Sequence, residues 1–498
     1  MRNLSKSKLL AYRQCPKRLW LEIHGRESPE PSAQTKARFQ VGHEVGKIAQ
    51  KIYDPKGKGV VFDPNVEGYD EVIARTADLI DSSRPLFEAG FTADGARAYV
   101  DVMLPLRRKG RQVWRMVEVK SASKLKDTHA DDIAIQTFIA RAAGVPVDSV
   151  ALAHIDGQWV YLGGGDYQGL LKEVDFTEQA FGREQEVRTW IAAAQVIARK
   201  RKEPEIETGA HCSNPYPCAF LDYCERDTVT AEYPVSWLPN KNDQLLALIE
   251  AEAATDLREV PDECLTAKQY RVKAHTLAGT VYFDAASAAD ALMAYSLPGY
   301  FLDFETIMLT VPIWKGTCPN TQIPFQFSLH RLTRTGKLTQ QAFLDLSGQD
   351  PSRKIAEALI AACGERGPIY VYSSFESGRI RYLAERLPGL ARPLLAINER
   401  LVDLLPIARE HYYHPEQQGS WSIKYLLPTI APDLRYDALD GVQDGGMAMA
   451  AYLEAIHPDT PPSRKAEIER QLLDYCGLDT YAMVRVWQLF SGRADLGL

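Results

Sequence analysis

The stretch YFLDFET, residues 300–306, constrains the fold of this chain more than any other. Three apolar residues lead into Asp303, Phe304 and Glu305, a pattern that indicates a buried strand. Successive side chains of a strand point to opposite faces, so Asp303 and Glu305 share one face. Adjacent buried carboxylates are costly without a compensating cation. The stretch therefore predicts a divalent-metal site, whereas the alternative is an ordinary strand with a solvated acidic face.

Length and composition predict a protein of several domains. The 498 residues exceed what one ordinary hydrophobic core holds. Because no apolar run has the length of a membrane span and the N-terminus lacks a signal-peptide pattern, we expect a cytoplasmic protein without a membrane partner. The net charge of −7 does not itself indicate nucleic-acid binding, which local basic patches can provide. Such patches occur at residues 6–18, 107–111 and 199–202, and each can equally be a solvated face.

A second acidic constellation lies in the first half of the chain. Two predicted strands, residues 99–106 and 112–121, are joined by a basic tip. Asp101 lies on the first strand, and Glu118 and Lys120 share a face of the second. Such carboxylates can hold Mg²⁺ or Mn²⁺ for phosphodiester hydrolysis, while the lysine stabilises developing negative charge. The alternative is a surface hairpin of mixed charge.

Two other polar residues are candidates for this site. Gln136 lies on a helix predicted directly after the hairpin and can approach the carboxylates. His43 lies on a helix predicted over residues 39–52. A lone histidine of this kind is more often a surface residue than a metal ligand.

Four of the eight cysteines form a pattern of their own. Cys212, Cys218 and Cys224 are evenly spaced, and Cys15 is the best candidate for a fourth ligand. In a cytosolic chain, clustered cysteines indicate a metal or cluster site rather than disulfides. Spacing alone leaves an iron–sulfur cluster and zinc equally open.

These motifs, in this order over residues 1–230, resemble the RecB-family PD-(D/E)XK nucleases. The resemblance is closest to the iron–sulfur subgroup found in AddB and in CRISPR spacer-acquisition nucleases. It implies that Asp101 and Glu118 bind metal, that Lys120 is catalytic and that Gln136 begins a Q-x-x-x-Y motif. The chain departs from the family at Ala140, where the motif has tyrosine, and in the Gly–His spacing before His43. The resemblance also favours a [4Fe–4S] cluster over zinc, held by Cys15, Cys212, Cys218 and Cys224.

Further candidate ligands follow the YFLDFET stretch. Predicted strands and helices alternate over residues 298–498. Tyr475 and Asp479 are four residues apart and share a face of a helix predicted over residues 472–490. Glu376 lies in the first turn of another predicted helix, and Asp403 lies early in a later element.

This second set of motifs resembles the RNase H-like DEDD exonucleases of the DnaQ type. In that family two metal ions promote attack of water on the terminal phosphodiester, and the tyrosine, here Tyr475, positions the water. The family has an aspartate where this chain has Glu376, which leaves open which middle carboxylate completes the site. The metal ligands that the resemblance implies are Asp303, Glu305, Asp479 and either Glu376 or Asp403.

The predicted secondary structure includes several elements whose bounds the structure can test. They are a helix over residues 5–22 interrupted at Cys15–Pro16, a strand pair over 150–161 turning at Gly157, a long helix over 179–202, and three helices between 231 and 297.

The sequence therefore predicts an α/β multidomain protein. Its expected parts are a PD-(D/E)XK nuclease domain at 1–230, a helical spacer at 231–297 and an RNase H-like exonuclease domain at 298–498. We expect a metal-dependent nuclease acting on DNA, with 3′–5′ exonuclease activity in the last domain. The alternatives are an RNA exonuclease and a nucleic-acid-binding protein with one decayed nuclease site. A helicase or a repair or defence partner is compatible with this prediction, but no residue identifies one.

Overall fold

The computed structural model describes residues 3–25, 33–226 and 231–493. It is a mixed α/β protein with several sheets, which confirms the predicted class at that level. The chain divides into two compact units. The first comprises Met1–Thr228 and Leu309–Asn320, and the second comprises Val229–Met308 and Thr321–Leu498. The predicted boundary at residue 230 falls outside the described residues.

The first unit is built on a seven-stranded sheet in the order β2-β3-β4-β5-β6-β7, with β1 paired to β4. Strands β3, β4 and β5 are antiparallel neighbours, and β5 pairs in parallel with β6 after the crossover helix α6. The strands are β1 (Leu4–Ser5), β2 (Val60–Val61), β3 (Leu86–Ala93), β4 (Ala96–Arg108), β5 (Arg111–Lys120), β6 (Val147–Ile155) and β7 (Leu171–Asp175).

Helices of the first unit enclose its main core, in which α6 packs against β3, β4 and β6. The predicted break at Cys15 is confirmed, because Pro16 begins a new helix at a position where its missing N–H costs nothing. The helices are α1 (Lys6–Gln14), α2 (Pro16–Ile23), α3 (Ala33–Tyr53), α4 (Pro64–Glu67), α5 (Tyr69–Leu79), α6 (Asp127–Ala142), α7 (Thr177–Gly182), α8 (Glu184–Arg199) and α9 (Leu221–Glu225).

Two predicted elements of the first unit were wrong in part. The expected strand pair over 150–161 is a single strand, β6, and residues 156–161 form no strand. The Tyr161 N–H instead donates to the Thr317 carbonyl oxygen, at 3.0 Å. The expected long helix is divided between α7 and α8, because Arg183 leaves helical geometry with ψ near 10°.

The second unit is built on a five-stranded sheet in the order β11-β10-β9-β12-β13. Strands β10 and β11 are antiparallel, whereas β12 is parallel to both β9 and β13. The YFLDFET stretch forms part of a strand, β9, as predicted. The structure places β9 at the centre of the sheet. The strands are β9 (Gly299–Leu309), β10 (Thr321–Leu332), β11 (Leu338–Leu344), β12 (Ile369–Val371) and β13 (Leu401–Asp403).

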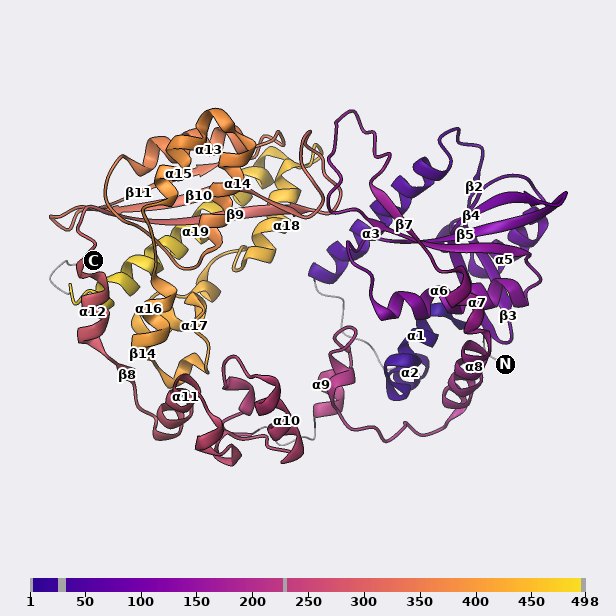
Figure 1. Ribbon diagram of the computed structural model, residues 1–498, viewed down its shortest axis with the longest axis horizontal. Helices are drawn as coiled ribbons and strands as arrows, with labels where there is room; N and C mark the ends of the chain where they lie inside the picture. Colours follow the sequence, from indigo (N-terminus) through magenta and orange to yellow (C-terminus); the bar gives the residue numbers. More distant parts are fainter. Residues whose placement is uncertain (1–2, 26–32, 227–230, 494–498) are drawn as a thin grey trace. The chain divides into compact units, whose positions relative to one another are not determined.

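Helices cover both faces of this sheet. Figure 1 shows α13, α14 and α15 on one face and α16, α17 and α19 on the other. Each layer has its own buried apolar cluster. The helices are α13 (Ser352–Cys363), α14 (Phe375–Arg386), α15 (Ala391–Asn398), α16 (Leu404–His411), α17 (Ile423–Ile430), α18 (Gly445–Ile456) and α19 (Pro462–Phe490).

The region predicted as a helical spacer folds as part of the second unit. It contains the expected three helices, α10 (Asp243–Ala251), α11 (Ala267–Ala278) and α12 (Ala285–Met293). After α11, strand β8 (Tyr282–Phe283) pairs antiparallel with β14 (Tyr412–Tyr413). On α11 itself, the Thr276 hydroxyl lies 2.6 Å from the Tyr413 hydroxyl. These contacts join the region to β14, which directly follows α16.

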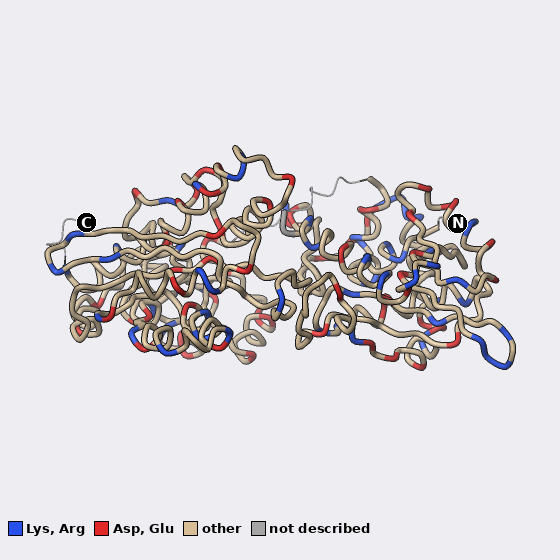
Figure 2. The backbone as a smooth tube through the Cα atoms, turned by 90° about the horizontal axis from the view of Figure 1, so that it is seen from above, with Lys and Arg blue, Asp and Glu red and all other residues tan. Residues whose placement is uncertain are grey.

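Within the described residues, no helix combines the length and apolarity needed to cross a bilayer. Acidic and basic residues are interspersed along both units, as Figure 2 shows.

Candidate metal centres

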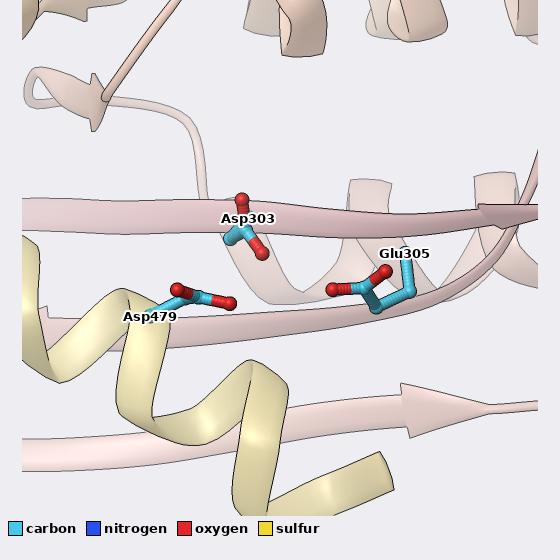
Figure 3. A group of neighbouring side chains, drawn as sticks. All are labelled: Asp303, Glu305 and Asp479. Atoms are coloured by element: carbon cyan, nitrogen blue, oxygen red, sulfur yellow. The ribbon is translucent and has the colours of Figure 1, made fainter. Parts of the chain in front are cut away.

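Three carboxylates of the second unit converge at one point. Asp303 and Glu305 come from β9 and Asp479 from α19, which packs against β10 and β11. One oxygen from each side chain lies within 4.8 Å of the others (Figure 3). Glu305 and Asp479 are each only 8% exposed. A buried strand and a buried helix face thus gather the first and last predicted ligands into a group that could hold a metal ion.

The electrostatics of this group show that its negative charge exceeds what the neighbouring Lys424 offsets. Burial, and then repulsion by Asp479, raises the pKa of Glu305 to about 8. Burial also raises the pKa of Asp479 to about 6, although Tyr436 and Lys424 oppose the rise. The pKa of Asp303 is raised well above its usual value by burial and by Asp479, Glu376 and Glu305. A divalent cation would remove this repulsion.

The structure distinguishes between the two middle carboxylates. Glu376 is buried in the first turn of α14, where burial raises its pKa to about 7, and its charge acts directly on Asp303. Asp403 is half-buried and caps α16, its Oδ1 accepting from the Leu405 N–H at 2.9 Å. Glu376 is therefore the better candidate for the fourth ligand. Asp403 contributes its charge to Glu376 from the cap position.

Tyr475 lies beside Asp479 with two residues that the sequence did not single out. The Tyr436 hydroxyl donates to Asp479 Oδ1 at 2.6 Å. Lys424 Nζ lies 5.2 Å from the Tyr436 ring centroid and 5.3 Å from that of Tyr475. Burial and the neighbouring carboxylates raise the pKa of the Tyr475 phenol. Nothing in the local sequence marks Tyr436 or Lys424, because neither belongs to a spaced motif.

The four polar residues predicted for the first unit come together. The Gln136 amide donates to Glu118 Oε2 at 2.6 Å, and Lys120 Nζ donates to Glu118 Oε1 at 2.6 Å. Asp101 Oδ2 accepts from the Val119 N–H at 2.7 Å, which ties β4 to β5 at this point. Burial and then Glu118 raise the pKa of Asp101 well above its usual value.

Three residues that the sequence did not assign complete this group. Lys6 Nζ lies 2.9 Å from both Glu118 Oε1 and Asp132 Oδ1. Asp132 also pairs with Lys120, and despite its burial the two lysines lower its pKa. Glu88 adopts a positive φ of 58°, rare for a non-glycine residue, and burial followed by Glu118 raises its pKa. Asp132 lies four residues before Gln136, so its shared helix face was a usable signal.

His43 and residue 140 lie elsewhere. His43 is exposed on α3, and among the described residues no hydrogen bond or ion pair joins it to the acidic group. Ala140 is fully buried in the main core of the first unit, where it provides no hydroxyl. A role for His43 as a metal ligand stays a prediction.

The four predicted cysteine ligands line one small cavity in the first unit. None forms a disulfide. The loop that carries three of them is tied to the end of α1 by Gln14, whose amide donates to the carbonyls of His211 at 2.8 Å and Tyr216 at 2.7 Å. Within the described residues, no three cysteine sulfurs lie within 4.8 Å of one another. The cysteines are Cys15, Cys212, Cys218 and Cys224.

Comparison with known proteins identifies one related family. The family described as "Domain of unknown function (DUF2779)" matches residues 300–422. This range includes Asp303, Glu305 and Glu376 and ends before Tyr475 and Asp479. Among curated proteins, no sequence matches the chain. The match therefore covers three of the carboxylates in the second unit, but the description of the family assigns them no chemistry.

Proposed function

We propose that this protein is a metal-dependent nuclease acting on DNA, with a 3′–5′ exonuclease centre in its second unit. The observation that carries the proposal is the convergence of Asp303, Glu305 and Asp479 within 4.8 Å. The five-stranded mixed sheet with the D-x-E strand at its centre agrees with the resemblance to RNase H-like exonucleases. Glu376 is the fourth ligand in this proposal.

The side chains around the centre can support hydrolysis of a terminal phosphodiester. Bound Mg²⁺ or Mn²⁺ would polarise the phosphate and lower the pKa of a water nucleophile. The buried phenol of Tyr475 can orient that water by a hydrogen bond. Tyr436 holds the Asp479 carboxylate in place, and Lys424 adds positive charge near the reacting phosphate.

For the first unit we propose a second, RecB-like nuclease centre formed by Asp101, Glu118, Lys120 and Gln136. Strands β3 to β5, the helix α6 and the parallel strand β6 agree with the PD-(D/E)XK resemblance. The contacts of Lys6 and Lys120 with Glu118 favour the alternative, a decayed site that still binds nucleic acid, since they neutralise the carboxylate without metal. Titration with Mn²⁺ distinguishes the two, because a decayed site would show no Glu118-dependent binding.

Replacing Lys120 by Ala should reduce the activity of the first centre by about 10²- to 10⁴-fold, because the lysine stabilises charge that develops on the phosphate. Cleavage of an oligonucleotide blocked at its 3′ end should measure this centre without the exonuclease. Lys172→Ala, an exposed lysine on β7 outside the three basic patches, is the matched control. Unchanged cleavage by Lys120→Ala would remove Lys120 from the proposed mechanism.

We also propose that the four-cysteine cavity holds a [4Fe–4S] cluster. Tetrahedral zinc, with Zn–S bonds of about 2.3 Å, would bring the sulfurs within about 3.8 Å of one another. The four cysteines line one cavity, and the resemblance to the iron–sulfur subgroup is what favours the cluster over zinc. Lys17 and Arg18 also line the cavity and would balance the negative charge of thiolate ligands.

Anaerobically purified protein should be brown and contain about four irons per chain. Cys218→Ala should lose the colour and most of the iron, because it removes one ligand from the cavity. Cys264→Ala, an exposed cysteine of the second unit, should retain both. One zinc per chain in place of iron would contradict the cluster, and unchanged iron in Cys218→Ala would place it elsewhere.

A further inference from the structure

A cleft opens beside the carboxylate centre of the second unit. Its volume is about 630 Å³, within the range of small-molecule sites. Asp303 and Glu376 line it, so the proposed metal centre borders this space. Trp237 and Lys268 line it as well, and both come from the region predicted to be a spacer. That region thus contributes a wall of the site.

The backbone around Trp237 is fixed by one contact with residue 419 and by hydrogen bonds within the predicted spacer. A Cβ at Gly419 would overlap the Trp237 carbonyl oxygen, so the two backbones are in direct contact there. The Gln269 amide donates to the Pro239 carbonyl at 2.9 Å, and Lys241 Nζ donates to the Leu238 carbonyl at 2.7 Å. Trp237 therefore occupies a fixed position rather than the tip of a loose loop.

The cleft combines two kinds of recognition group. Lys268 and Arg409 line it, and within the described residues neither forms an ion pair of 4.0 Å or less, although the charge of Arg409 opposes the rise in the pKa of Asp403. Cations of this kind beside a cluster of carboxylates suit a phosphate group that bridges to bound metal. Trp237 supplies an indole, on which a nucleobase can stack regardless of its sequence.

We propose that this cleft binds the terminal nucleotide of the strand being trimmed, with its base against Trp237 and its phosphate near Lys268 and Arg409. The inference rests on the proposed exonuclease function. It states which side chains would position the terminal nucleotide so that the scissile bond lies at Asp303. It also assigns the residues before β9 a direct role in substrate binding. The exonuclease domain then begins at the Trp237 segment and not at residue 298.

The test compares two substrates in the full chain carrying Lys120→Ala, which silences the first centre. A 5′-labelled oligonucleotide uses the whole cleft, whereas bis(p-nitrophenyl) phosphate has neither base nor sugar and uses only the metal centre. Trp237→Ala and Lys268→Ala should each raise KM for trimming about tenfold or more, with kcat/KM for the small ester unchanged. Tyr270→Ala, an exposed aromatic on α11, should change neither value.

Wild-type KM for trimming in both variants would overturn the proposal. So would an equal loss of both activities, because that result would mean a structural role for the wall. If the Lys120→Ala protein hydrolyses neither substrate, the proposed exonuclease function fails. Calorimetric titration with nucleoside 5′-monophosphates in Ca²⁺ then tests nucleotide binding to the cleft independently of catalysis. Binding that weakens in Trp237→Ala supports the cleft, and absence of binding overturns it. Comparing 2′-deoxyuridine and uridine 5′-monophosphates, which differ only at the 2′ position, shows which sugar is preferred.

Discussion

Asp303→Asn should abolish metal-dependent trimming of 3′ ends, lowering the rate by more than about 10²-fold. Asp303 belongs to the carboxylate group, and the charges of Asp479, Glu376 and Glu305 all act on it. An amide keeps the shape of the side chain but removes the charge that a divalent ion needs. Rates on a 5′-labelled oligonucleotide, in the Lys120→Ala background, measure the effect, and Asp479→Asn should behave in the same way.

Three further variants give this prediction its controls. Asp290→Asn, an exposed carboxylate on α12, should leave trimming unchanged. Glu376→Gln should act like Asp303→Asn, whereas Asp403→Asn should retain most activity, because asparagine also caps a helix. Trimming that persists in both Asp303→Asn and Asp479→Asn would exclude this centre. Loss of trimming in Asp403→Asn, with Glu376→Gln active, would exchange the assignments of the two middle carboxylates.

Sequence periodicity predicted most of the second carboxylate centre because its residues lie in regular elements. The alternation of β9 places Asp303 and Glu305 on one face, and the helical repeat of α19 places Tyr475 beside Asp479. The choice between Glu376 and Asp403 needed the structure, since both follow strands of the same sheet. The burial of Glu376, its action on Asp303 and the cap bond from Asp403 to the Leu405 N–H separate them.

Apart from those of Asp132, the main side-chain contacts at the two centres that the sequence did not predict join segments far apart in the chain. Tyr436 reaches Asp479 across 43 positions, and Lys6 reaches Glu118 across 112. No local pattern encodes such pairs, because tertiary packing alone decides them. Tertiary packing also decides where the predicted spacer lies. Its three helices were predicted correctly, but its position beside the carboxylates Asp303 and Glu376 was not predicted.

The stability of the metal-free second unit should fall as the pH rises from 6.5 to 8.5. The pKa values of Glu376 and Glu305 are about 7 and about 8 in the folded state, above the ordinary glutamate value. The folded state therefore binds more protons than the unfolded state in this range, so the free energy of unfolding decreases as they are released. The decrease should be roughly 2 kcal/mol over the window. Calorimetry in EDTA measures it as a falling Tm.

The choice of window and the effect of metal make this result specific to the carboxylates. His330 has the opposite sign, because burial lowers its pKa to about 4, but most of its contribution falls below pH 6.5 and only about 0.4 kcal/mol remains above it. Mn²⁺ should reverse the slope, since metal binds the deprotonated carboxylates and stabilises the folded state more at higher pH. Replacing both Glu305 and Glu376 by Gln should flatten the slope in EDTA and remove the effect of Mn²⁺. A Tm that rises with pH in EDTA would show that these carboxylates are not held protonated, and the argument that the centre requires a cation would fail with it.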